Sequence, residues 1–277
     1  MTTRDGDDLH VEDGGARLTV RPSRGGMLTA FEVGGARVLF MDDATLADPS
    51  KNVRGGVPVL FPSPGKLAGD AWAYGGAAGS MKQHGFARDL PWRVASASSS
   101  AVALELAATP ATRARFPWDF AVQLTYALRG ATLHIEHHVV NRSATPMPFG
   151  FGFHPYFFVR DADKARARVA TGATRAFDNV AKQPVALRGI DLTQPEVDLH
   201  LLDHGSTESA LTFPGGEVRL RGSPEYTHWV VWTLAGRDFV CLEPWTCPGN
   251  ALNTGERLIV LAPGASRSLW LELTYAA

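Results

Sequence analysis

FAVQLTYALRGATLHIEHHVV, at residues 120–140, alternates apolar and polar side chains on both sides of Arg129-Gly130. A period of two is typical of a β-strand that buries one face. Glycine accepts the positive φ of a tight turn, so the chain can reverse at Gly130. The stretch therefore predicts two antiparallel strands, over 120–128 and 132–140, joined as a hairpin.

The same alternation continues along the chain. A second hairpin is predicted around Gly34-Gly35, between strands at 27–33 and 38–41. No segment holds a helical period of 3.6 beyond two turns, and the 28 glycines and 18 prolines are spread throughout. We therefore predict an all-β fold, a large antiparallel β-sandwich. Further strands are expected at residues 18–20, 92–94, 102–106, 228–233, 239–242, 257–261 and 268–275.

Residues 160–188 differ from their surroundings because they are charged, rich in alanine and poor in large apolar side chains. The strand pattern has the same character on both sides of them, so a loop or an edge hairpin is favoured over a domain boundary. No internal repeat, low-complexity run or Gly/Ser-rich linker interrupts the chain. The prediction is a single domain over residues 1–277.

Composition narrows the classes of function. Lysine and arginine number 27 against 28 aspartates and glutamates, which argues against a nucleic-acid-binding protein. No apolar run approaches the roughly 18 residues that a membrane span needs, and the first ten residues lack the apolar core of a secretory signal. We expect a cytoplasmic protein that acts on a small molecule. Its two cysteines, Cys241 and Cys247, are too few for a disulfide framework.

One candidate site begins at RGGVPVLFP, residues 54–62, and continues at QHGFARD, residues 83–89. Glycines beside Arg54 and His84 allow a ligand to approach the backbone closely. Arginine offers five donors in a fixed fork, so Arg54 and Arg88 suit an anionic or polyhydroxylated small molecule. The alternative is that these arginines are surface charges and Gly-Gly is only a turn.

Two further segments place a titratable side chain in apolar surroundings. His154 lies among aromatic residues in FGFGFHPYFF, residues 149–158, where burial lowers a histidine pKa. A core histidine bonded to a carbonyl is the alternative. Glu243 ends an apolar strand in VCLEPWT, residues 240–246, beside Trp245, which could stack on a sugar. A structural ion pair with an arginine is its alternative.

Metal sites and nucleotide motifs are not expected. His134, Glu136 and His138 share one face of a predicted strand, but a solvated polar face explains them better than a metal trio. Cys241 and Cys247 lack neighbouring ligands at metal-site spacing. No phosphate-binding glycine loop, nucleophile elbow or dinucleotide fingerprint is present.

Taken together, these motifs resemble the aldose 1-epimerase (mutarotase) family, whose fold is the galactose-mutarotase-like β-sandwich. The resemblance spans about residues 14–273 and keeps the family's motif order. It implies interconversion of the α and β anomers of an aldose with no cofactor. The matching segments are RGGVPVLFP at 54–62, HGFARDLPW at 84–92, FGFHPYF at 151–157 and CLEPWT at 241–246.

The resemblance also implies roles for single residues. Glu243 matches the general base and His154 the general acid, facing each other across the sugar. His84 matches a histidine that binds near the ring oxygen. The remaining implied contacts are Arg54 and Arg88 as pocket arginines, Asp198 as the aspartate on sugar hydroxyls with Asp178 as its substitute, and Trp245, Phe153 and Trp72 as stacking surfaces.

Two other functions compete with a free-aldose epimerase. A hexose-6-phosphate 1-epimerase would use basic residues on the phosphate, with Arg54, Arg88, Lys66 and Lys82 as candidates. A non-catalytic sugar-binding module on the same fold would have no need of an acid–base pair, so Glu243 and His154 argue against it. The preferred sugar and the oligomeric state do not follow from the sequence.

Overall fold

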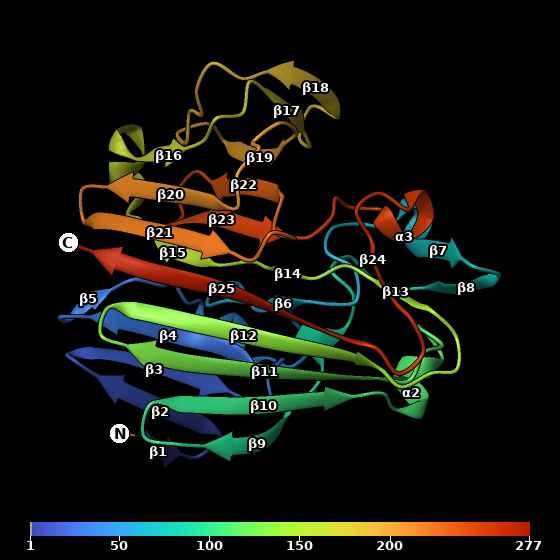
Figure 1. Cartoon of the computed structure of the whole chain (residues 1–277). Coiled ribbons are helices and arrows are strands. Elements are labelled where there is room, and N and C mark those ends of the chain that lie inside the picture. Colours follow the sequence, from blue (N-terminus) through green and yellow to red (C-terminus); the bar gives the residue numbers. More distant parts are fainter. Residues whose placement is uncertain (1) are drawn as a thin grey trace.

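The computed structural model describes residues 2–277, in which three antiparallel sheets form most of the fold (Figure 1). Sheet 1 contains β1 (Thr2–Asp5), β2 (Asp8–Asp13), β3 (Ala16–Arg21), β4 (Met27–Val33) and β5 (Ala36–Arg37), in that order. Sheet 2 has the order β16 (Arg168–Ala170), β20 (Glu208–Phe213), β21 (Gly216–Gly222), β25 (Ser266–Ala276), β12 (Thr132–Asn141), β11 (Phe120–Arg129), β10 (Ala101–Ala107) and β9 (Arg93–Ala97). Sheet 3 has the order β18 (Gln183–Ala186), β17 (Arg175–Asp178), β19 (Glu196–Leu201), β22 (His228–Leu234), β23 (Phe239–Trp245), β14 (Gly152–Phe153) and β6 (Val59–Leu60), and β15 (Tyr156–Phe158) also pairs with β23.

The remaining elements are short. Two small ribbons pair β13 (Met147–Phe149) with β24 (Ile259–Leu261) and β7 (Ala71–Tyr74) with β8 (Ala77–Ser80). The α-helices are α1 (Asp43–Ala47), α2 (Pro110–Arg113) and α3 (Ala251–Thr254), and the 3₁₀ helices are η1 (Ala68–Asp70), η2 (Ala87–Asp89) and η3 (Asp161–Arg166). Helices in residues 2–277 fall short of the length and hydrophobicity that a membrane crossing needs.

The sheets pack as two layers. Figure 1 shows sheet 2 in front, from β16 at the top to β9 at the bottom, with sheets 3 and 1 behind it. Leu28 of sheet 1 bridges Val57, which precedes β6 in the chain, and Leu39, which follows β5, bridges Phe157 of β15. A continuous cluster of buried side chains includes members from all three sheets, such as Val11, Leu124 and Leu242. The predicted all-β sandwich is therefore confirmed.

The hairpin at 120–140 forms as predicted, with Leu128 opposite Leu133 in β11 and β12. The turn at Gly34-Gly35 also forms, but the predicted strand at 38–41 is wrong because β5 ends at Arg37. Past Arg37 the chain leaves sheet 1, and Leu39 bridges Phe157 instead. The edge hairpin expected within 160–188 is present as β17 and β18, which end sheet 3.

Sheet 3 separates its side chains by strand alternation. Val231 of β22 and Leu242 of β23 are opposite each other and belong to the core. Val230 and Glu243, the next residues in each strand, are also opposite each other and face away from that core. One face of sheet 3 thus packs against the core of the sandwich, and the other forms the floor of a pocket.

Candidate active site

A pocket of about 730 Å³ lies against this outer face of sheet 3. This volume falls within the range of small-molecule sites. All seven residues that the sequence singled out for the site line it: Arg54, His84, Arg88, His154, Asp198, Glu243 and Trp245. Strands β19, β22 and β23 supply the floor, and the loops around residues 54, 65, 84 and 249 supply the walls.

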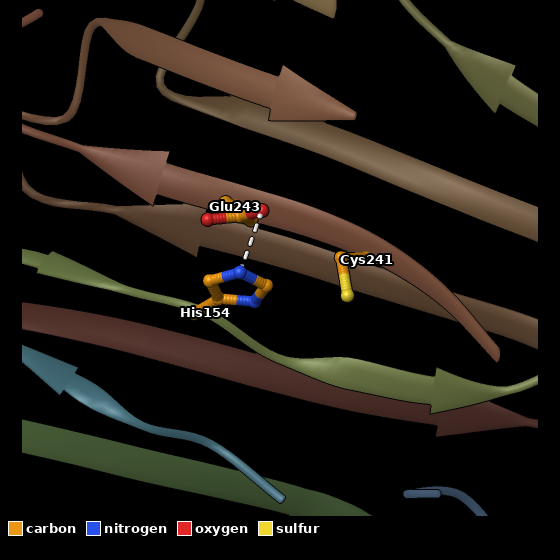
Figure 2. Close-up of side chains that lie close together, drawn as sticks. All are labelled: His154, Cys241 and Glu243. Atoms are coloured by element: carbon orange, nitrogen blue, oxygen red, sulfur yellow. Dashed lines mark ion pairs between the residues drawn. The ribbon is translucent and has the colours of Figure 1, made fainter. Parts of the chain in front are cut away.

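Cross-strand register places His154 beside Glu243. Gly152 of β14 is opposite Trp245, and Tyr156 of β15 is opposite Cys241, so the position between these two pairs puts His154 opposite Glu243. His154 Nε2 lies 3.3 Å from Glu243 Oε1 (Figure 2). The two side chains therefore share one pocket, as expected, but the expectation that they face each other across a sugar is wrong for this structure. Directly opposed strand positions bring side chains into contact rather than a sugar's width apart.

Burial determines the protonation of this pair. Both residues are buried, with 11% of the His154 side chain and 2% of the Glu243 side chain exposed. Desolvation, followed by the charge of Asp198, raises the pKa of Glu243 well above its usual value. Desolvation, followed by Arg88, lowers the pKa of His154 to about 3. Burial therefore favours the neutral form of both groups, the carboxyl group with its proton and the imidazole without one. One member can thus give a proton while the other takes one.

Trp245 orients the carboxyl group. Its indole Nε1 donates to Glu243 Oε2 at 3.2 Å, which leaves Oε1 for His154. The indole is itself 2% exposed and lies edge-on to the ring of His84. Trp245 therefore acts on the carboxyl group within the floor, while little of its face is free to stack on a ligand.

His84 is a neutral hydrogen-bond donor in this pocket. Its Nδ1 accepts the backbone N–H of Gly65 at 3.1 Å, so the proton of the neutral ring is on Nε2. Burial, with the charges of His154 and Arg88, lowers its pKa well below the usual value. His84 has a φ of +72°, an uncommon backbone conformation for a residue with a side chain.

The two arginines differ in their surroundings. Arg88 is largely buried and donates to the backbone carbonyl of Gln83 at 3.0 Å. Its positive charge acts on Glu243, whose pKa it lowers. Arg54 is exposed at the rim, where its backbone N–H donates to Thr45 Oγ1 at 2.9 Å. Arg88 therefore belongs to the interior of the site and Arg54 to its entrance.

Two histidines of the floor were missed by the sequence analysis. His200 Nδ1 lies 3.0 Å from His228 Nε2, and His200 Nε2 lies 3.7 Å from Asp198 Oδ1. The ring of His228 stacks on Trp245, with centroids 5.6 Å apart. A signal was available: His200 is two positions from Asp198, the spacing that places two side chains on one face of a strand.

Between the two aspartate candidates, the structure places Asp198 in the pocket, where its Oδ2 accepts from Asn179 Nδ2 at 2.6 Å. Asp178 instead caps the β17–β18 turn by accepting the backbone N–H groups of Val180 and Ala181. Alternation along the strand explains why these neighbours differ, since Phe177 and Asn179 line the pocket and Asp178 lies between them.

Both additional stacking candidates are wrong. Trp72 is 2% exposed and packs against Phe116 and Trp118, outside the pocket. Phe153 is fully buried beside His137, because it precedes His154 in the chain and faces the core instead. Of the two candidate lysines, Lys66 lines the pocket and Lys82 does not.

The face of β12 that carries His134, Glu136 and His138 is polar, as expected. His134 contacts Glu272, at 3.3 Å between Nδ1 and Oε1, and stacks on Trp270. His138 Nδ1 lies 2.9 Å from Ser268 Oγ. Each of these histidines pairs across the strands to β25, so the spacing His134–Glu136–His138 does not form a joint ligand set.

The fold and the pocket define a β-sandwich protein with a pocket of small-molecule size over a buried pair of a carboxyl group and an imidazole. The family model for aldose 1-epimerase matches residues 7–274, so the chain belongs to the aldose 1-epimerase family. It is an isomerase of the epimerase type that acts on a small sugar. This confirms the family, the fold and the class of reaction that the motifs implied.

Individual relatives agree with this assignment. The crystal structure of the Slr1438 protein from Synechocystis sp. PCC 6803 is 37% identical, with a TM-score of 0.93 over 100% of this chain and 99% of that one. A galactose mutarotase related enzyme from Lactobacillus acidophilus shares the fold, at 20% identity and a TM-score of 0.76 over 98% of this chain and 97% of that one. A Cenchrus ciliaris protein named "Putative glucose-6-phosphate 1-epimerase" is 26% identical over 87% of this chain and 76% of its own length.

Proposed function

We propose that this protein interconverts the α and β anomers of an aldohexose through Glu243 and His154. The observation that carries the proposal is the 3.3 Å contact between these two side chains on the floor of a sugar-sized pocket. The C1 hydroxyl and the ring oxygen of a pyranose are bonded to the same carbon. Two adjacent groups can therefore reach both atoms from one side, and they need not enclose the sugar.

Ring opening needs one proton removed and one delivered. Glu243 takes the proton of the C1 hydroxyl as the bond from C1 to the ring oxygen breaks, and His154 gives a proton to that oxygen. Rotation about the C1–C2 bond presents the other face of the aldehyde, and closure returns both protons. Burial favours the proton on Glu243 over His154, so this direction starts with its transfer to His154 across their contact.

The other lining residues would hold the sugar. Asp198 offers carboxylate oxygens to hydroxyl groups, and the Nε2–H of His84 donates toward the ring oxygen or its neighbours. Arg54 at the entrance and Arg88 inside supply further donors. The single-domain organisation and the cytoplasmic location expected from the sequence stay predictions.

A hexose 6-phosphate is the second candidate substrate. Arg54, Lys66 and Lys182 line the same pocket, and the Cenchrus ciliaris relative carries a name for that activity. A phosphate group could bind these side chains without any change at the acid–base pair. The two candidates share one mechanism and differ in what occupies the rim.

Polarimetry on freshly dissolved α-glucose, α-galactose and α-glucose 6-phosphate tests the proposal. We expect the protein to accelerate mutarotation of the free sugars, with a KM for glucose no higher than that for the phosphate ester. A KM for glucose 6-phosphate well below that for glucose, rising with salt, would assign the protein to the second candidate. Absence of acceleration with all three sugars would contradict both.

A further inference from the structure

Cys241 brings a third donor group to the acid–base pair. The ligand atoms of His154, Cys241 and Glu243 all lie within 4.8 Å of one another, and all three residues are buried. Figure 2 shows the imidazole of His154 below the carboxyl group of Glu243, with the thiol of Cys241 beside both of them. Cys241 is two residues before Glu243 in β23, so alternation directs both to one face. The mechanism above does not use this thiol.

Donor atoms in this cluster are available. His154 is 8% exposed, and its Nδ1 is buried with no hydrogen-bond partner. Cys241 is fully buried and forms no disulfide, and its thiol makes no hydrogen bond to residues 2–277. A buried polar atom without a partner is uncommon and calls for an explanation. A metal ion would give the thiol the partner it lacks, and it would bind His154 through Nε2, the ring nitrogen that faces Glu243.

We propose that His154, Cys241 and Glu243 bind a thiophilic divalent cation such as Zn²⁺, and that the bound ion blocks the sugar site. Zn²⁺ takes imidazole, thiolate and carboxylate ligands in tetrahedral sites, at about 2.0–2.2 Å for nitrogen and oxygen. Two such ligands lie roughly 3.4 Å apart across a tetrahedral angle. The measured separation of His154 Nε2 and Glu243 Oε1 is 3.3 Å.

Charge and orientation favour the same ion. A thiolate and a carboxylate neutralise Zn²⁺, so the filled site buries no net charge, and the protons of the thiol and of the Glu243 carboxyl group leave for solvent as the metal binds. Trp245 already holds Glu243 through its second oxygen, as outer hydrogen bonds hold the ligands of metal sites. Mg²⁺ and Ca²⁺ prefer oxygen ligands in larger numbers, so the cluster selects against them.

The ion and the sugar would compete, because both need His154 and Glu243. The proposal departs from the sequence expectation of no metal site. It goes beyond the proposed function, since metal binding by three donors does not depend on which sugar is converted. An ion that reached the cluster would remove the acid–base pair from catalysis.

Co²⁺ as a spectroscopic substitute for Zn²⁺ tests the site directly. With the full-length protein we expect a thiolate-to-cobalt charge-transfer absorption, together with the visible bands of tetrahedral Co²⁺, both displaced by Zn²⁺. Cys241→Ala should lose the charge-transfer absorption. Cys247→Ala, which removes the other buried cysteine, should retain it. No charge-transfer absorption in the unaltered protein would overturn the proposal.

Inhibition gives the second readout. Zn²⁺ should raise the KM for the sugar without lowering kcat, whereas Mg²⁺ at the same concentration should not. In Cys241→Ala, the Zn²⁺ concentration for half-inhibition should rise at least about tenfold, as expected for loss of one ligand. Equal inhibition of Cys241→Ala and of the unaltered protein would contradict the site. Absence of epimerase activity would leave the cobalt spectrum unaffected, so the two proposals can fail separately.

Discussion

Glu243 and His154 are two buried groups whose pKa values burial moves in opposite directions. Replacing Glu243 with glutamine keeps the size and the contact with Trp245 but removes the group that exchanges a proton. We expect kcat to fall by about 10²–10⁴-fold, the usual contribution of a positioned acid or base, with a small change in KM. His154→Asn should behave in the same way. Polarimetric progress curves over a range of sugar concentrations measure both constants.

Glu105→Gln serves as the control for this experiment. Glu105 pairs with Arg93 on sheet 2, away from the pocket, and the same chemical change there should leave kcat unaltered. Turnover by Glu243→Gln at the rate of the unaltered protein would remove Glu243 from the mechanism.

Asp198 affects the pair through its charge. It is the largest cause, after burial, of the raised pKa of Glu243. The pair can no longer donate a proton once Glu243 ionises with His154 neutral, so kcat/KM should fall on the alkaline side. In Asp198→Asn the negative charge is gone, and this alkaline limb should move to lower pH. Profiles of kcat/KM against pH for the two proteins provide the comparison.

The direction of the shift separates two roles of Asp198. Loss of a hydrogen bond to the sugar alone would raise KM and leave the alkaline limb in place. An unmoved limb in Asp198→Asn would therefore show that the charge of Asp198 does not control Glu243.

At the scale of elements, the passage from β14 to β15 allows the site to form. Gly152 faces Trp245 across the strands, and a Cβ at Gly152 would lie 2.7 Å from Trp245 Cδ1. The indole would have to move, and with it the donor on Glu243. We expect Gly152→Ala to lower both the melting temperature and kcat, as calorimetry and polarimetry would show.

Gly172→Ala is the matched control, because a Cβ there would meet only a carbonyl oxygen of His204 at 3.6 Å, an ordinary contact. An unchanged kcat in Gly152→Ala would mean that the position of Trp245 does not matter to the carboxyl group.

The sequence predicts single elements better than it predicts their pairing. Alternation was enough to place the hairpin at 120–140, and Glu243 stood out as a carboxylate at the end of an apolar strand. It could not show that His154 lies in contact with Glu243, because that depends on the register between strands far apart in the chain. Phe153 was misplaced for the same reason: an aromatic residue beside a site histidine can belong to either face. His200 and His228 were missed since each is a lone histidine until the strands pair.

For the whole molecule, buried neutral histidines make stability depend on pH. The pKa values of His137, His154 and His228 are each lowered to about 3, chiefly by burial. Below the ordinary value near 6.5, the unfolded chain binds a proton at each of them and the folded protein does not. The free energy of unfolding should thus fall with decreasing pH, by up to about 1.4 kcal/mol per unit for each histidine. The raised pKa of Glu243 makes the free energy of unfolding rise with decreasing pH, but this is one group against three histidines.

Urea unfolding at pH 7.5 and 5.5 measures this dependence. The double variant His137→Phe/Tyr226→Phe removes a buried histidine together with the Tyr226 hydroxyl, 2.9 Å from its Nε2, and leaves neither partner unsatisfied. We expect a weaker pH dependence for this variant than for the unaltered protein. His138→Gln, a change at the polar face, should keep the original dependence. Equal stability of the unaltered protein at both pH values would contradict the assignment.

The pocket lies on the outward face of sheet 3, while the layers adhere through its inward face. A sugar can therefore bind, react and dissociate without separation of the two layers. The stability of the core and the turnover rate at the site can therefore be changed separately, which is favourable for protein engineering. Improved packing around Leu124 or Val231 should raise the melting temperature and leave the turnover rate at moderate temperature unchanged.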